Sequence, residues 1–200
     1  MKDKYYTITN QQTAELKLKS SKFIGYAFPV HNKENAFLKL NEVKVKHFDA
    51  THNCFAYQIW NGNKYRTSDD GEPAGTAGKH ILLTIKKYDL NDVLVIVTRY
   101  FGGIKLGMGG LVRAYTETTD SVLKLCEKKI VNITNSIRIN CRYEEISIVK
   151  RIINEYAISF SEKYMDSIEI ITHIPLSKTD QFMNTIISVT KAKAIVELER

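Results

Sequence analysis

The hydrophobic pattern is most regular after residue 135, where strand and helix periods alternate. Residues 136–143 (SIRINCRY) alternate between apolar and polar side chains, which predicts a half-buried strand. Apolar side chains spaced three and four residues apart predict two helices, over residues 146–156 and 182–189. Two strand-like runs lie between these helices, and residues 194–199 (AIVELE) predict a last strand. The order is βαββαβ, which predicts a ferredoxin-like domain over residues 135–200.

The pattern before residue 130 predicts a different domain. Strands are expected around residues 5–10, 21–30, 54–60 and 64–68, with a hairpin turn at residues 61–63, and helices are expected after Asn32, around residues 77–85 and after Gly110. The run VLVIV, residues 93–97, is apolar without alternation, which predicts a strand covered on both faces. Together these elements predict an α+β domain with a mixed sheet over residues 1–130. The whole chain is therefore expected to be α+β with two domains.

Two shorter signals concern the ends of elements. Asn32 stands where it can cap the first helix. Ser177 and Asp180, three residues apart after Pro175, have the spacing of a capping box at the start of the last helix.

Composition narrows the class of protein. The chain has 200 residues and no apolar run that approaches the ~20 residues needed to span a bilayer. Its start lacks the apolar stretch of a signal peptide, so we expect no export and no membrane partner. The three cysteines are widely spaced without a CxxC pair, which is typical of a reducing compartment. We therefore expect a cytoplasmic protein.

The net charge of +7 is concentrated in the first domain. Residues 131–200 carry nine of the 29 Lys and Arg and nine of the 22 Asp and Glu, so residues 1–130 carry the remaining 20 and 13. Such an excess favours encounters with polyanions and non-specific phosphate binding, although basic composition alone also serves solubility.

A glycine-rich stretch follows the apolar strand. Residues 99–115 (RYFGGIKLGMGGLVRAY) hold five of the ten glycines and lead into a predicted helix. The positive end of a helix binds anions, and glycine lets a ligand approach the backbone closely. We therefore predict an anion or nucleic-acid site formed by three cations and five glycines: Arg99, Lys105, Arg113, Gly102, Gly103, Gly107, Gly109 and Gly110. The alternative is that the glycines serve only tight turns and close packing.

A second cluster, residues 68–80 (SDDGEPAGTAGKH), does not fit a phosphate loop. The pattern GxxxxGK[ST] needs glycine where Pro73 stands and Ser or Thr where His80 stands. The acidic residues Asp69, Asp70 and Glu72 could bind a metal or act as acid and base, but a solvated acidic turn is the favoured interpretation.

His52 and Cys54 share a strand face and could form a thiolate–imidazole pair or half a zinc site. Zinc needs four ligands, and no second pair has metal-site spacing, so a packed cysteine beside a hydrogen-bonded histidine is favoured. No catalytic residue, metal or cofactor is predicted. Aromatic residues near the cations could stack on bases, but for Phe101 and Tyr115 we expect core packing.

The motifs THNCFAY, SDDGEPAGTAG, ILLTI and VLVIVTRYFGGIKLGMGGLVRAY, in this order and spacing, resemble the Impact family in its compact bacterial, YigZ-type form. The family pattern marks further positions without giving them a chemical role. Besides residues of the predicted site, they are His52, Cys54, Asp69, Asp70, Gly71, Glu72, Pro73, Gly75, Thr76, Gly78, Tyr100, Phe101 and Tyr115.

The resemblance implies a first domain similar to the second domain of a small-subunit ribosomal protein and a second domain similar to the ferredoxin-like domain of elongation factor G. Eukaryotic relatives regulate translation by countering a starvation kinase through an additional N-terminal domain. We see no such domain in this sequence, so we do not expect that role to carry over.

We therefore predict a protein that binds RNA or the ribosome and modulates translation. One alternative is an enzyme that acts on a phosphorylated or anionic small molecule with the acidic turn beside the glycine loop. Another is a module that docks a protein partner on the C-terminal sheet.

Overall fold

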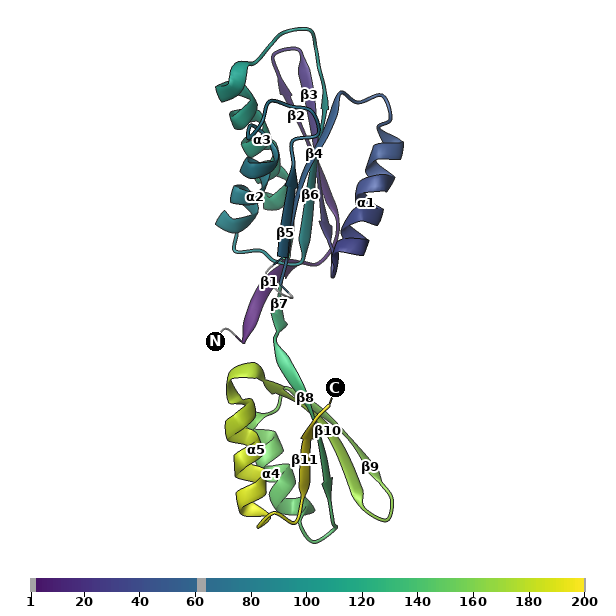
Figure 1. Ribbon diagram of the computed structural model, residues 1–200, viewed down its shortest axis with the longest axis vertical. Coiled ribbons are helices and arrows are strands. Elements are labelled where there is room, and N and C mark those ends of the chain that lie inside the picture. The colour runs from purple at the N-terminus through teal and green to yellow at the C-terminus, as the bar shows by residue number, and fades with distance from the viewer. Residues whose placement is uncertain (1–2, 61–63, 200) are drawn as a thin grey trace. The chain divides into compact units, whose positions relative to one another are not determined.

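The computed structural model describes residues 3–60 and 64–199. It divides into an N-terminal unit, Tyr5–Val131, and a C-terminal unit that starts at Asn132 and also includes Asp3 and Lys4. The protein is α+β, with helices and antiparallel sheets in both units (Figure 1). None of the helices in the described ranges is long and apolar enough to cross a membrane.

The N-terminal unit is built from one main sheet and three helices. Its strands are β1 (Lys4–Ile8), β2 (Gln12–Leu18), β3 (Ser21–Pro29), β4 (His52–Ile59), β5 (Lys64–Ser68), β6 (Val93–Tyr100) and β7 (Lys128–Asn132), and its helices are α1 (Lys33–Lys46), α2 (Gly78–Lys87) and α3 (Gly107–Lys124). The main sheet has the order β2-β3-β6-β4-β5, and β1 pairs with β7.

Every pairing in the five-stranded sheet is antiparallel, so the expected mixed sheet is wrong. The unalternating apolar run in β6 is covered on both faces, as predicted, because β6 is the central strand and helices lie on both sides of the sheet (Figure 1). Figure 1 shows α1 on one face of the sheet and α2 and α3 on the other. Two apolar clusters accordingly fill the two interfaces, and Val93, Val95 and Val97 face α2 and α3 while Leu94 and Ile96 face α1.

Most elements of this unit match the sequence prediction. Asn32 caps α1 by accepting the backbone N–H of Asn35 at 2.7 Å, as expected. Strand β2 was not predicted: it alternates, but it lies at the sheet edge and buries few side chains. The predicted turn at residues 61–63 lies outside the described residues, although β4 and β5 do pair as a hairpin.

The C-terminal unit has the predicted βαββαβ order. Its elements are β8 (Thr134–Cys141), α4 (Ile146–Tyr156), β9 (Ser159–Tyr164), β10 (Ile168–Pro175), α5 (Thr179–Val189) and β11 (Ile195–Leu198). The strand order β11-β8-β10-β9 is that of a ferredoxin-like sheet. Helices α4 and α5 cover one face and enclose an isoleucine-rich core with it (Figure 1).

Two local predictions in this unit fail. Ser177 does not form a capping box, because it lies in a short 3-10 turn before α5, and its backbone N–H bonds the carboxylate of Asp3 at 2.7 Å. Tyr143 does not continue the buried face of β8, since the strand ends at Cys141 and the ring is exposed.

Candidate functional site

A pocket of about 440 Å³ opens at one end of the strands of the five-stranded sheet, where β4 begins and β6 ends. The antiparallel register places His52 opposite Arg99 at this end. The loop after β5 returns to the same end of the sheet, and the glycine loop and the start of α3 complete the wall of the pocket. The lining residues are Thr51, His52, Glu72, Pro73, Arg99, Phe101, Lys105, Leu106, Gly107, Met108 and Leu111.

A buried hydrogen-bonded network forms one wall of the pocket. Arg99 Nη1 donates to Glu72 Oε1 at 2.6 Å, and the Tyr115 hydroxyl donates to the same oxygen at 2.7 Å. The Arg99 and Glu72 side chains are only 5% and 2% exposed. The sequence predicts Arg99 as a phosphate contact, but here the Glu72 carboxylate already compensates its charge.

The Arg99 guanidinium nevertheless keeps one donor without a partner. Its Nη2 lies 3.5 Å from the Ser21 hydroxyl oxygen, and the group is sandwiched between the rings of Phe23 and Phe101, at 5.4 and 5.3 Å. Its Nε is buried and has no hydrogen-bond partner among the residues that the structure describes. Buried donors are normally satisfied, so this nitrogen is an exception within the network.

Asp69 organises the loop between β5 and α2. Its carboxylate accepts the backbone N–H groups of Gly75, Ala77 and Gly78 at 2.8, 3.0 and 2.8 Å, which caps the start of α2 from a distance. Burial acts to raise the pKa of this carboxyl group, but the three N–H donors outweigh it and hold the pKa below its usual value. The interpretation as a solvated acidic turn is therefore wrong, because these carboxylates hold the loop together.

Asp70 is equally engaged. It accepts the backbone N–H of Asn53 at 2.7 Å and pairs with Lys44 at 3.0 Å. The Asp70 carbonyl accepts from His52 Nδ1 at 2.8 Å, which leaves His52 Nε2 at 3.9 Å from Glu72 Oε2. Of the three acidic residues, only Glu72 lines the pocket.

Cys54 is a packed core thiol, as favoured from the sequence. It is fully buried, it donates to the Asp69 carbonyl at 2.9 Å, and burial raises its pKa to about 12. A thiolate–imidazole pair is therefore not formed at neutral pH. No group of three or more His, Cys, Asp and Glu in the described part of the chain could hold a metal ion.

The glycine loop differs from the prediction in where the helix begins. Helix α3 starts at Gly107 rather than after Gly110, so three glycines lie in its first turn, and no side chain caps it. Arg113 is consequently in the second turn, where it pairs with Glu117 at 2.7 Å and does not line the pocket. Lys105 is exposed, lines the pocket and makes no ion pair with any described residue.

The structure brings together only part of the predicted site. Seven predicted positions line the pocket: His52, Glu72, Pro73, Arg99, Phe101, Lys105 and Gly107. The other motif positions shape the loops, and examples are Gly71 and Gly103 at positive φ and Thr76, whose hydroxyl donates to the Pro73 carbonyl. Tyr100 contacts His47 and Asp49 instead.

Two further observations concern side chains of the pocket and its surroundings. Tyr115 is in the core as expected, but the expected burial of Phe101 is wrong, since it follows the strand end and is 45% exposed over Arg99. Thr51, Leu106, Met108 and Leu111 also line the pocket and were not predicted. Their only sequence signal is that they lie within or beside the glycine-rich and THNCFAY motifs.

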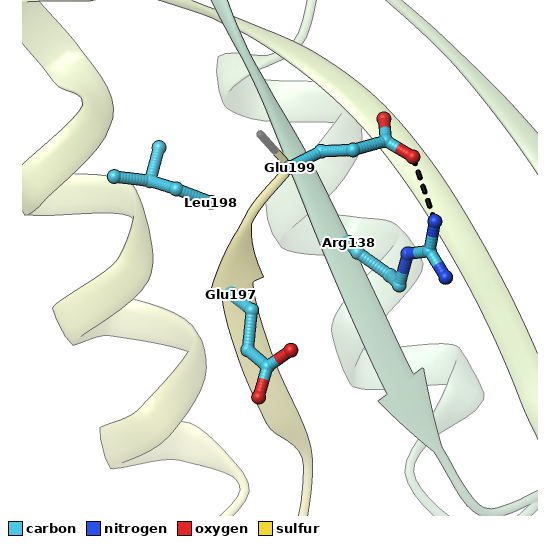
Figure 2. A pocket seen from close by; sticks show the side chains of 4 residues that line it. All are labelled: Arg138, Glu197, Leu198 and Glu199. Atoms are coloured by element: carbon cyan, nitrogen blue, oxygen red, sulfur yellow. Dashed lines mark hydrogen bonds and ion pairs between the residues drawn. The ribbon is translucent and has the colours of Figure 1, made fainter.

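A second hollow, about 660 Å³, lies on the C-terminal sheet and is lined by Arg138, Glu197, Leu198 and Glu199. Figure 2 shows that these side chains come from two adjacent strands, with Arg138 turned towards Glu199. Arg138 also pairs with Glu169 at 3.3 Å. The carboxylates outnumber the single guanidinium, so this surface does not suit a polyanion.

Comparison with known proteins places this geometry in a family. The Impact N-terminal domain matches residues 19–123, a range that contains the whole pocket. The IMPACT family member YvyE of Bacillus subtilis is 32% identical over 96% of this chain and 90% of its own length. The member YigZ of Escherichia coli is 30% identical over 69% of both chains. The crystal structure of a hypothetical protein superposes with a TM-score of 0.70 at 24% identity, covers 100% of this chain and 99% of that one, and supports the fold alone. The chain belongs to the Impact family.

Proposed function

We propose that this protein binds RNA, either free RNA or RNA within the ribosome, through the pocket at the strand ends of its N-terminal unit. We also propose that it modulates translation in the cytoplasm. The observation that carries the proposal is the start of α3, which no described side chain caps, beside Lys105, which forms no ion pair with a described residue. A helix N-terminus carries about half a positive charge and presents free N–H groups, which suits a phosphate.

The charges around this pocket also favour RNA as the ligand. Glu72, the one carboxylate among the described residues that line the pocket, is paired with Arg99, and the neighbouring Asp69 and Asp70 are held by backbone N–H groups and Lys44. Residues 1–130 carry the entire net charge of +7. The exposed Phe101 ring at the pocket rim offers a surface on which a base could stack.

The C-terminal unit supports the proposal only indirectly. Its open sheet face mixes Arg138 with Glu169, Glu197 and Glu199, so the RNA contact is assigned to the N-terminal unit. The link to translation comes from the family resemblance. The cytoplasmic location is proposed from three cysteines that are all free thiols.

A second candidate function is an enzyme that acts on a phosphorylated small molecule. In favour of an enzyme, the pocket brings Glu72 and His52 together with the glycine loop. Catalysis by Glu72 would require this residue to give up its two hydrogen bonds, so binding is the better supported function.

Fluorescence anisotropy with labelled single-stranded RNA over a salt series tests the proposal. The variant Lys105→Ala should bind more weakly, and its plot of log K against log salt should be shallower by about 0.7, the value for one phosphate contact on a single strand. The matched control is Lys124→Ala, which removes the same charge at the far end of α3, about 27 Å away along the helix. Equal effects of both variants, or no binding by the unmodified protein at low salt, would overturn the proposal.

A further inference from the structure

One side of α2 and the edge strand β5 form a second surface of the N-terminal unit, away from the pocket. Tyr65, Lys79, Leu83 and Lys86 make up this α2–β5 surface. We propose that a single RNA strand lies on it, with phosphates at Lys79 and Lys86 and a base on the ring of Tyr65. The inference rests on the proposed function, and it extends the RNA contact beyond the pocket to a second, separately testable surface.

The charge on this side of α2 is not balanced within the protein. Lys79 and Lys86 are exposed, and neither forms an ion pair with a described residue. On the same helix, Lys87 reaches Asp120 of α3 at 3.5 Å, so its charge is compensated. Two uncompensated cations on one surface attract a polyanion, and each phosphate that they neutralise releases counterions.

The spacing of the exposed side chains suits an extended strand. Lys79, Leu83 and Lys86 are four and three residues apart, so they form one stripe along α2. The two lysines are about 10 Å apart along the helix axis, so they contact different phosphates of one strand. Leu83, which is 49% exposed, lies between them and adds apolar surface.

Tyr65 adds an aromatic ring to the same surface. Strand β5 is an edge strand of the sheet, and Tyr65 on it is 59% exposed. Lys86 Nζ lies 4.9 Å from the centre of the Tyr65 ring, which joins the cation and the ring in one contact. Aromatic rings beside cations are typical of surfaces that bind single-stranded nucleic acid, because every base can stack on them. An acidic peptide would use the two lysines but not the ring, so RNA is the better match.

The α2–β5 surface starts at the end of the sheet where the pocket opens. Strand β5 ends at Ser68, which is paired with Phe55 near the start of β4. Gly78 at the start of α2 packs so closely on Ser68 that a Cβ there would lie 2.7 Å from the Ser68 nitrogen. Lys79 therefore lies at the pocket end of α2 and Lys86 farther along, so one strand can continue from the pocket onto this surface.

Fluorescence anisotropy with labelled single-stranded RNA over a salt series tests the two lysines. The double variant Lys79→Ala/Lys86→Ala should bind more weakly, and its plot of log K against log salt should be shallower by about 1.4, twice the value for one phosphate contact. The matched control is Lys39→Ala/Lys46→Ala. It removes two lysines with the same seven-residue spacing from α1, on the opposite face of the sheet (Figure 1), where each also lies over an aromatic ring. Equal changes of slope in both double variants would mean that only net charge matters, and the inference would be overturned.

Substitutions of Tyr65 test the stacking contact. Tyr65→Ala should weaken RNA binding about fivefold or more, whereas Tyr65→Phe should bind like the unmodified protein, because stacking needs the ring and not the hydroxyl group. Urea unfolding of both variants establishes that they are folded under the binding conditions. Unchanged binding by folded Tyr65→Ala would overturn the inference. Displacement of the RNA by poly-glutamate as readily as by unlabelled RNA would also overturn it, since the surface would then serve an acidic chain.

The same titrations separate this inference from the proposed function. If Lys105→Ala flattens the salt dependence and the variants of the α2–β5 surface do not, the inference is overturned and RNA binding at the pocket stands. If those variants flatten it and Lys105→Ala behaves like its control, the inference stands and the pocket is not the contact. If the unmodified protein binds no RNA at low salt, both are overturned.

Discussion

The buried ion pair between Glu72 and Arg99 allows a quantitative test of how the pocket wall is held. Glu72→Gln removes the negative charge but keeps the side chain's size and its ability to accept from Tyr115. The guanidinium, 5% exposed, would then be an uncompensated buried charge. Breaking a buried pair in this way costs about 3–5 kcal/mol. Because the pocket adjoins Arg99 and admits water, we expect a value near the lower end, about 3 kcal/mol of unfolding free energy.

Urea unfolding followed by tryptophan fluorescence measures this loss of unfolding free energy in the N-terminal unit. The chain has one tryptophan, Trp60, and it stacks on Tyr5 within the N-terminal unit with ring centroids 5.0 Å apart. The second variant, Arg99→Met, removes the opposite charge. In the double variant neither charge of this buried pair remains, so its loss of stability should be well below the sum of the two single losses.

The matched control is Glu117→Gln, which breaks the pair with Arg113 on the surface of α3. Its side chains are 41% and 72% exposed, and such a pair is worth about 0.5 kcal/mol or less. If Glu72→Gln cost no more than this control, or if the losses of the double variant were simply additive, the argument that Glu72 neutralises a desolvated Arg99 would be refuted.

Three further outcomes follow from the same loops. Asp69→Asn should lower stability by about 1–3 kcal/mol, because one oxygen cannot serve three N–H donors. Because the pKa of Asp69 is lower in the folded state than its unfolded value of about 4, the ionised carboxylate stabilises the fold above about pH 4, and this contribution is lost as pH falls through the folded pKa. The unfolding free energy should therefore depend less on pH in Asp69→Asn than in the unmodified protein when both are titrated with acid. Gly102→Ala places a Cβ 1.7 Å from the Ser20 carbonyl and should cost about 1–3 kcal/mol or more in urea unfolding, whereas a cost near zero would contradict the close approach. Cys54, with its pKa near 12, should resist alkylation by iodoacetamide at pH 7.5 until urea unfolds the chain, and rapid native labelling would show that it is not buried.

The sequence predicts elements better than it predicts the site. Helix α1 with its Asn32 cap and the central strand β6 depend on local spacing, which a single sequence displays. The start of α3 could not be placed, because glycines usually mark a loop, and here packing of Leu111 continues the helix back to Gly107. The pairing of Glu72 with Arg99 depends on the register of β4 with β6 and on the fold of the loop after β5. No local pattern encodes such a contact.

The position of Arg99 also has a consequence for how β6 finds its place. An apolar run buried on both faces, such as Val93–Val97, is nearly as well accommodated if the strand slips by one residue, since either face accepts valine or isoleucine. A slip by one residue would carry Arg99 to the face covered by α1, away from the Glu72 carboxylate that it bonds together with Tyr115 of α3. The charged end of the strand therefore disfavours this shifted alignment. The ion pair between Glu72 and Arg99 forms in the native alignment, in which the pocket also exists. The same contact therefore stabilises both the alignment of β6 and the wall of the pocket.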